Sequence, residues 1–283
     1  MITPAYNEQE NLPRLFESVH GQELRPIIWI IVNDGSTDQT ARVIDEASRK
    51  YGYVKALHLE RDYVESYYAR KIHAFQKGVA FLNALGVEYE YIANLDADMT
   101  LPSDFYSRLL HEFEIDPQLG IAGGVYRYAD DCDRPLLDDG YVSAGTAMFR
   151  RKCFQQVGGF RPLKYGAEDT LACLMARAKG WNTRRVSACM AVTHRRVGTS
   201  GGAGMLKARF RQGISEYNIG YHPLFAFLKL IKRMVVEKPY LVGACARYIG
   251  CLCGPFFVDR QMVPAEAVAQ LRKEQFARLK ALR

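Results

Sequence analysis

Short apolar runs alternate with helical patterns over the first hundred residues, and this alternation constrains the fold more than any other feature. Residues 27–32, with the sequence IIWIIV, are apolar on both faces, as expected of a central strand in a parallel sheet. Residues 54–59 and 91–95 are two further strand candidates, and residues 67–85 have a helical pattern. The alternation predicts an α/β domain with a doubly wound, mostly parallel sheet flanked by helices.

The first helix is expected to begin soon after a short strand that ends at Pro4. Asn7 can cap this helix, and Glu10, three residues later, can complete a capping box. The apolar residues that follow, from Leu12 to Val19, recur on one helical face. We therefore expect the helix to start beside Asn7.

Two carboxylates, Asp96 and Asp98, come directly after the strand candidate at 91–95. In extended chain, residues i and i+2 point to the same side, so these side chains can converge. Two carboxylates held close repel unless a cation lies between them, and hard oxygen ligands suit Mg²⁺ or Mn²⁺ carried in with a phosphorylated substrate. The spacing also arises by chance, since Asp131 and Asp133 repeat it in a polar loop that no strand precedes.

Polar segments follow three of the expected strands, at residues 4–8, 33–38 and 96–98. In doubly wound sheets, ligands bind at the carboxyl ends of strands, near a switch in strand order. We therefore interpret the aspartate pair as part of a binding site rather than as a chance pattern.

Composition excludes several classes of protein. The 283 residues are 48% hydrophobic and 24% charged, as in an ordinary soluble globular protein. Seven cysteines without regular spacing favour a reducing compartment over a disulfide framework. The first residues do not have the pattern of a signal peptide, and no run of eighteen uncharged apolar residues predicts a spanning helix.

The net charge of +7 is unevenly distributed along the chain. Residues 205–283 hold 14 lysines and arginines against 5 aspartates and glutamates, whereas the rest of the chain holds 24 against 26. This excess indicates an anionic surface as a partner, either a membrane or a nucleic acid. Residues 221–258 also mix aromatic, leucine and basic residues, as in helices that lie in a membrane interface. The alternative is a buried helical subdomain packed on the catalytic core.

The polar motifs, taken in order, resemble those of the family 2 glycosyltransferases of GT-A fold. The resemblance covers roughly residues 1–200. Residues 205–283 resemble the tails of bacterial or archaeal members that build surface polysaccharides. The motifs are TPAYNE at 3–8, NDGSTD at 33–38, DAD at 96–98, GTAMFRR at 145–151, VGGF at 157–160 and GAED at 166–169.

The resemblance implies a nucleotide-sugar donor and a divalent metal ion, Mn²⁺ or Mg²⁺. Asp98 would hold the ion, with Asp96 bonded to the donor's ribose or to the ion through water. The ion would act as a Lewis acid on the departing nucleoside diphosphate. His194 ends an apparent strand over 186–193 and resembles a third metal ligand, although a lone histidine is more often structural or a surface group.

For the donor pocket, the resemblance implies that Asp34 binds the base and that Pro4, Tyr6 and Glu8 line the same pocket. The alternative role of Asp34 is to form the turn before Gly35, and both roles can hold together.

Three basic residues are candidates for contacts with the diphosphate. Arg70 and Lys71 lie on the helix expected to face the nucleotide, although solvated helix charges are the commoner explanation. Arg196 follows Arg195 in a stretch rich in Gly and Ser, at 195–204, whose two arginines can close over a pyrophosphate.

The acceptor hydroxyl must lose a proton as it attacks the donor, which calls for a general base. The resemblance assigns this role to Asp169, with Glu168 as the alternative. Both are expected at a helix N-terminus, where the helix dipole also favours carboxylates for purely structural reasons. The implied reaction is a single displacement that inverts the anomeric carbon.

The sequence departs from the family pattern in three places. The first strand is short, so we expect that a few N-terminal residues are missing or that the chain begins at an internal Met. Asn33 precedes Asp34 where two acidic residues are usual. The Gln-x-x-Arg-Trp segment of processive polymerases is absent, and its nearest counterpart, RFRQG at 209–213, favours a single-addition enzyme.

We therefore expect a cytoplasmic inverting glycosyltransferase, peripheral at the inner face of the cell membrane, that transfers a sugar to a glycan or lipid-linked acceptor in surface polysaccharide synthesis. Residues 1–204 would form the catalytic domain, with a nucleotide-sugar half over 1–100 and an acceptor half over 101–204, and residues 205–283 would form a basic helical tail.

A sugar-phosphate nucleotidyltransferase is one alternative, but residues 1–25 lack a Gly-rich basic phosphate loop. A nucleic-acid-binding protein is another, but its aromatic and basic residues should interleave on a sheet, so no nucleic-acid partner is expected. The oligomeric state is left open.

Overall fold

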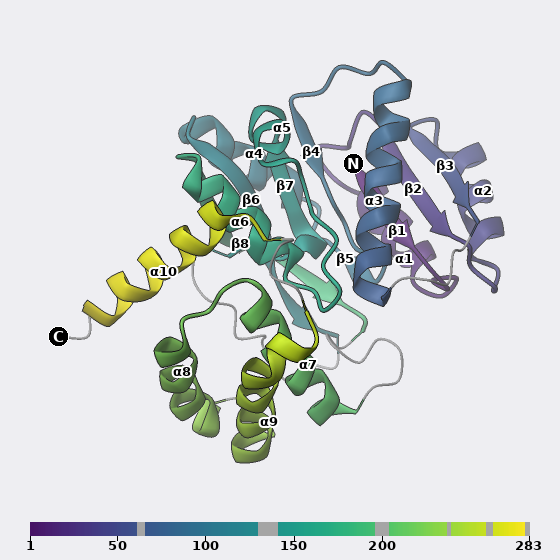
Figure 1. The fold of residues 1–283 in the computed structure, drawn as a ribbon. Helices are drawn as coiled ribbons and strands as arrows, with labels where there is room; N and C mark the ends of the chain where they lie inside the picture. The colour runs from purple at the N-terminus through teal and green to yellow at the C-terminus, as the bar shows by residue number, and fades with distance from the viewer. Residues whose placement is uncertain (61–65, 130–140, 196–203, 237–238, 259–262, 281–283) are drawn as a thin grey trace.

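The apolar run at 27–32 leads into β2 (Trp29–Asp34), the middle strand of a three-stranded parallel sheet (Figure 1). The computed structural model describes residues 1–60, 66–129, 141–195, 204–236, 239–258 and 263–280. The partners of β2 are β1 (Ile2–Ala5) and β3 (Val54–Leu59). The helices α1 (Leu12–His20), α2 (Thr40–Lys50) and α3 (Tyr67–Ala84) alternate with these strands, which confirms the predicted alternation.

Both faces of β2 are covered, as its apolar pattern predicted. Ile30 lies in one apolar cluster with Phe75 of α3, whereas its neighbours Trp29 and Ile31 lie in a second cluster with Leu15 of α1. Each large side chain buried in this way contributes about 1.5–3 kcal/mol relative to exposure, so the sheet is a rigid base for the loops at its edge.

Five further strands form a second, mixed sheet: β4 (Tyr91–Ala93), β5 (Met99–Thr100), β6 (Leu119–Tyr128), β7 (Ala147–Arg150) and β8 (Asn182–Thr193). Their order is β4-β7-β6-β8-β5, and β6 with β8 is the parallel pair among antiparallel ones. The two sheets meet where β1 lies beside β4, through a bridge between Ile2 and Asn94 and a hydrogen bond from Leu95 N to Ile2 O (3.1 Å). The order of the strands reverses at this junction, and open α/β sheets bind ligands at such a point.

Helices and one short 3₁₀ turn accompany the second sheet: α4 (Phe105–Ile115), η1 (Ala144–Thr146), α5 (Arg151–Val157) and α6 (Glu168–Ala178). The C-terminal region then continues as α7 (Met205–Asn218), α8 (Pro223–Val236), α9 (Tyr240–Cys253), η2 (Gly254–Phe256) and α10 (Ala265–Lys280). No helix in the described ranges is both long enough and apolar enough to cross a bilayer.

The C-terminal region has two parts with different surroundings. Helices α7, α8 and α9 pack against one another at one end of the molecule, beyond both sheets (Figure 1). By contrast, α10 packs on the core of the sheets, where Ala267 and Leu271 are buried in the same cluster as Leu171 of α6. Arg177 Nε also donates to Glu274 Oε1 across this contact (2.7 Å). Helix α10 lies outside residues 221–258, for which a packed helical subdomain was the alternative, so this contact does not decide that alternative.

The predicted cap of the first helix is wrong. Helix α1 begins at Leu12, after Asn11, and Asn7 lies in the left-handed region with φ 53°. The Asn7 side chain accepts a hydrogen bond from Thr37 N (2.9 Å) instead of capping α1. Asn7 therefore joins the loop after β1 to the loop after β2.

Candidate active site

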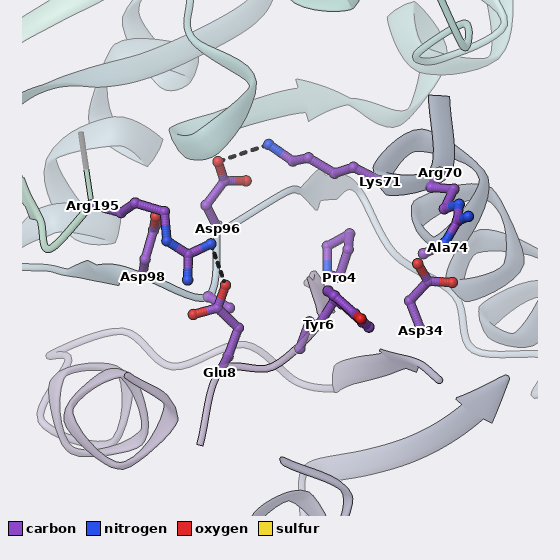
Figure 2. Close-up of a pocket in the computed structure, with 12 residues that line it drawn as sticks. Pro4, Tyr6, Glu8, Asp34, Arg70, Lys71, Ala74, Asp96, Asp98 and Arg195 are labelled. Carbon is purple, nitrogen blue, oxygen red and sulfur yellow. Dashed lines mark hydrogen bonds and ion pairs between the residues drawn. The ribbon is translucent and has the colours of Figure 1, made fainter. Parts of the chain in front are cut away.

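A pocket opens at the carboxyl ends of β1, β2 and β4, at the junction of the two sheets (Figure 2). It is an open cleft of about 550 Å³, counting the space continuous with solvent. Figure 2 shows Asp34 and Arg70 on one side and Asp96, Asp98 and Glu8 on the other. Its lining brings together eight of the residues expected from the sequence: Pro4, Tyr6, Glu8, Asp34, Arg70, Lys71, Asp96 and Asp98.

Asp96 is held in place from three directions. Lys71 Nζ donates to Asp96 Oδ2 (2.7 Å), and Asn94 Nδ2 donates to Asp96 Oδ1 (3.0 Å). A Cβ atom at Gly145 would lie 2.8 Å from Asp96 Oδ2, so a larger residue there would push the carboxylate out of place. The carboxylate is therefore fixed before any ligand arrives.

Asp98 and Glu8 form an acidic pair deeper in the same wall. Burial raises the pKa of Asp98 to about 7, and the charges of Asp96 and Glu8 add to this effect. Burial also raises the pKa of Glu8. The cation beside this pair is Arg195, whose Nη1 lies 2.9 Å from Glu8 Oε1. The wall thus concentrates negative charge that positive groups stabilise.

Two arginines after β8 were candidates for contacts with the diphosphate. Arg196, which the sequence analysis assigned to the donor, lies outside the described residues. Arg195, the other arginine of this stretch, lines the pocket. Its position agrees with the expectation that an arginine after β8 lies near the donor.

His194 does not line this pocket. Its backbone N donates to Asp98 O (2.8 Å), but its ring nitrogens contact Thr100 Oγ1 (3.2 Å) and Arg14 Nη1 (3.3 Å). Within the described ranges, no three His, Cys, Asp or Glu side chains are grouped closely enough to hold a metal ion. His194 as a third ligand stays a prediction that this arrangement does not support.

Asp34 occupies the opposite side of the pocket. Burial raises its pKa, and the positive charges of Arg70 and His73 oppose the shift. Gly35 follows with φ 61°, so the turn-forming role expected of this segment is also met. Position in the pocket and formation of the turn are therefore compatible, and base binding by Asp34 stays a prediction.

Glu168 and Asp169 begin α6, directly after Gly166 and Ala167, which both have positive φ (85° and 77°). Burial raises the pKa of Glu168 to about 7, and the neighbouring Asp169 charge adds to the shift. Burial also raises the pKa of Asp169, whose carboxylate accepts a hydrogen bond from Thr170 N (2.6 Å). An alanine in the left-handed region is strained, and such strain is often found at functional sites.

The 3₁₀ turn η1 connects the two groups of carboxylates. Ala144 N donates to Asp169 Oδ2 (3.4 Å), and Asp96 N donates to Gly145 O (3.1 Å). Asn94 Nδ2 also donates to Ala144 O (2.7 Å). Sequence reasoning missed Asn94, although a polar residue inside an apolar strand, two positions before Asp96, is a signal for such a buried anchor.

The family model for glycosyl transferase family 2 matches residues 1–197, which is more than half of the chain. The chain therefore belongs to glycosyl transferase family 2.

Curated relatives match a smaller part of the chain. The chain is 31% identical over 123 residues, 44% of its length, to a poly-β-1,6-N-acetyl-D-glucosamine synthase of Staphylococcus epidermidis. It is 33% identical over 122 residues, 43% of its length, to a 4,4'-diaponeurosporenoate glycosyltransferase of Staphylococcus aureus. These matches span 27% and 29% of the relatives' own lengths, so the chain corresponds to less than a third of each.

Solved structures share the fold at low identity. One of them is the mannosyltransferase PcManGT from Pyrobaculum calidifontis, solved with GDP-Man and Mn²⁺. The match covers 99% of this chain and 77% of PcManGT, with a TM-score of 0.58 and 17% identity. TarS residues 1–349 from S. aureus, solved with UDP-GlcNAc, have a TM-score of 0.58 and 14% identity, covering 99% of this chain and 91% of their own. The GT-A fold predicted from the motifs is thus confirmed.

Proposed function

We propose that the protein transfers a sugar from a nucleotide-sugar donor to a glycan or lipid-linked acceptor in cell-surface polysaccharide biosynthesis. The observation that carries the proposal is the pocket at the sheet junction, where Asp34 lies on one side and Asp96 and Asp98 on the other. The relatives' names, a surface polysaccharide synthase and a glycosyltransferase, support this class of acceptor.

The pocket fits a divalent cation in charge and in ligand chemistry. Asp96 and Asp98 present carboxylate oxygens, the ligands that Mg²⁺ and Mn²⁺ prefer. Burial raises the pKa of Asp98, and the charges of Asp96 and Glu8 add to the shift; an added cation would relieve the part that these charges cause. In this proposal Asp96 and Asp98 hold the ion, which neutralises charge on the leaving diphosphate when it is bound.

Basic residues of the chain complete the donor site. Lys71 and Arg70 lie on α3 beside the pocket, and Arg195 lies on its opposite wall. Arginine binds phosphate oxygens through two parallel N–H groups, and lysine through a mobile point charge. We assign these three residues to the diphosphate, with Pro4 and Tyr6 as walls of the pocket between them.

Asp169 is the general base of the proposed reaction. As the acceptor hydroxyl attacks the anomeric carbon, its proton passes to an Asp169 oxygen. The bond between the anomeric carbon and the diphosphate oxygen breaks, and the diphosphate leaves with the electron pair. Attack from the face opposite the leaving group inverts the anomeric centre. The hydrogen bonds from Thr170 N and Ala144 N orient the carboxylate for this task.

Product analysis tests the proposal. The purified protein would be incubated with a panel of nucleotide sugars, Mn²⁺ or Mg²⁺, and simple glycan or glycolipid acceptors. We expect metal-dependent release of a nucleoside diphosphate, and a product whose anomeric configuration is opposite to the donor's when it is read by NMR. Retention of the donor's configuration would contradict the single displacement, and release of a nucleoside monophosphate would contradict the reaction class.

A further inference from the structure

Helix α8 carries an unusual exposed stripe. Leu224, Phe227, Leu228, Ile231 and Val235 follow one another at spacings of one, three or four residues and are 38–75% exposed. A helix on the surface of a water-soluble domain normally presents polar residues on this face. The exposed side of α8 is therefore largely apolar, with Lys232 as an exposed charge.

Helix α9 extends the same surface. It packs beside α8, where the rings of Phe227 and Tyr248 lie 6.1 Å apart. Leu241, Ile249 and Leu252 of α9 are more than half exposed. The two helices together thus expose a larger apolar surface than isolated surface leucines produce.

One cluster of charges is paired inside this helical unit. Glu216 of α7 is buried and accepts hydrogen bonds from Arg233 Nη1 of α8 (3.1 Å) and Arg247 Nη2 of α9 (2.8 Å). Burial alone would raise the pKa of Glu216, but the two arginines outweigh it and lower the pKa to about 2. The unit therefore has a paired charge cluster inside, whereas its exposed surface carries large apolar side chains together with Lys207 and Lys232.

Close packing of α7 on α9 also resembles packing between helices in an apolar medium. A Cβ atom at Gly213 would lie 1.8 Å from Arg247 O, and one at Gly250 would lie 2.0 Å from Phe210 O. Small residues that allow such close backbone approach are typical of helix pairs in membranes, where burial of apolar surface against lipid gives no driving force.

We propose that the apolar side chains of α8 and α9 insert into the interface of an anionic lipid bilayer. Residues 205–253 hold eight lysines and arginines against two acidic residues, and the buried Glu216 is already paired, so the charge around this surface complements anionic lipid. Two copies of the same basic surface would repel each other, which disfavours self-association through it. Helices of 14 residues are about 21 Å long, which suits lying in the plane of the interface.

The helical unit is fixed to the catalytic side of the protein. Ser215 Oγ of α7 donates to Gly166 O (3.1 Å), two residues before Glu168. Docking of α8 and α9 would therefore hold the acceptor side of the pocket near the lipid surface. This last step, toward a lipid-linked acceptor, rests on the proposed function, whereas the docking rests on the surface alone.

Vesicle flotation tests the docking without any substrate. The full chain and two variants, Phe227→Glu and Ile231→Glu, would be mixed with vesicles of phosphatidylcholine alone or with added phosphatidylserine, at low and high salt. We expect salt-weakened binding to the anionic vesicles, reduced about tenfold or more in each variant because a side chain that inserts into lipid is lost. Ile115→Glu, on an equally exposed isoleucine at the end of α4, should bind like the wild type.

A second measurement separates insertion from misfolding and from self-association. Ile231→Trp should show a blue-shifted emission with anionic vesicles and quenching by brominated lipid, whereas Ile115→Trp should show neither. Absence of wild-type binding to both kinds of vesicle would overturn the proposal. The proposal would also be overturned if the wild-type protein formed a dimer that Phe227→Glu dissociates and if the wild-type protein did not float with vesicles. These measurements use no substrate, so their outcomes do not depend on glycosyl transfer. The docking proposal and the proposed function can therefore be refuted independently.

Discussion

At the scale of single residues, the two carboxylates at the start of α6 have similar burial but different contacts. Asp169 is held by hydrogen bonds from Thr170 N and Ala144 N, which orient its oxygens. Glu168 has a pKa raised to about 7, chiefly by burial and then by the charge of Asp169. The hydrogen bonds that orient Asp169 support it as the base, with Glu168 as its neighbour.

Replacing each acid by its amide distinguishes the two roles. Asp169→Asn should lower kcat by about 10²–10⁴-fold and leave donor affinity nearly intact, because a general base acts on the acceptor proton. Glu168→Gln should retain much of the activity. Steady-state kinetics of both variants provide the measurement, and the assignment would be reversed if Glu168→Gln were the inactive one.

The same pair predicts a pH-dependent stability. The pKa of Glu168 in the folded protein, about 7, lies above its ordinary value of 4.5, so the folded chain holds a proton that the unfolded chain releases. This group contributes up to about 3 kcal/mol to the free energy of unfolding. The contribution is fully present below pH 4.5 and is lost as the pH rises through 7. Urea unfolding at pH 5 and pH 8 should therefore show a smaller loss of stability in Glu168→Gln than in the wild type. Equal losses of stability in the two proteins would show that Glu168 is not the source of the pH dependence.

Sequence reasoning located most of the pocket but not the contact that directs Arg195 into it. Pro4, Glu8, Asp34 and Asp98 were predictable because each follows an apolar strand, and parallel strands bring their ends together. Whether Arg195 enters the pocket depends on the direction in which the chain leaves β8. A long-range hydrogen bond, from His194 N to Asp98 O, helps to set that direction, and no local pattern encodes it.

At the scale of elements, local patterns predicted the strands and helices well. β3 and α3 lie where apolar runs and helical periodicity placed them, because these signals need no tertiary partner. The start of α1 was mispredicted because Asn7 can bond either to its own helix or to a neighbouring loop, and the contact with Thr37 prevails. For α8, periodicity shows that apolar residues share a face, but it does not show whether that face points inward or outward.

The crossing of α7 and α9 gives a test at this scale. Gly213→Ala would place a methyl group against the Arg247 carbonyl, so we expect a loss of at least about 1–3 kcal/mol in the free energy of unfolding. Gly52→Ala is the matched control, because nothing lies within 4 Å of a Cβ atom there. Chemical denaturation of both variants measures the difference. A loss no larger for Gly213→Ala than for Gly52→Ala would contradict the close packing.

At the scale of the whole molecule, two sheets meet along β1 and β4, and the pocket lies at their common edge. The first sheet supplies Glu8 and Asp34, and the junction supplies Asp96 and Asp98. The turn η1 then connects Asp96 to Asp169 on the acceptor side. The central claim is that this edge binds a nucleotide-sugar donor through a divalent ion held by Asp96 and Asp98.

Thermal unfolding with nucleotide sugars and their nucleoside diphosphates, with and without Mn²⁺, tests that claim most directly. For a ligand at a hundred times its Kd, we expect the wild-type Tm to rise by about 5 °C or more with Mn²⁺, because the ligand binds the folded protein alone. Asp98→Ala should lose this metal-dependent rise, whereas Asp104→Ala, whose carboxylate pairs with Arg108 outside the pocket, should keep it. An unchanged, Mn²⁺-dependent rise in Asp98→Ala would contradict the assignment of the site.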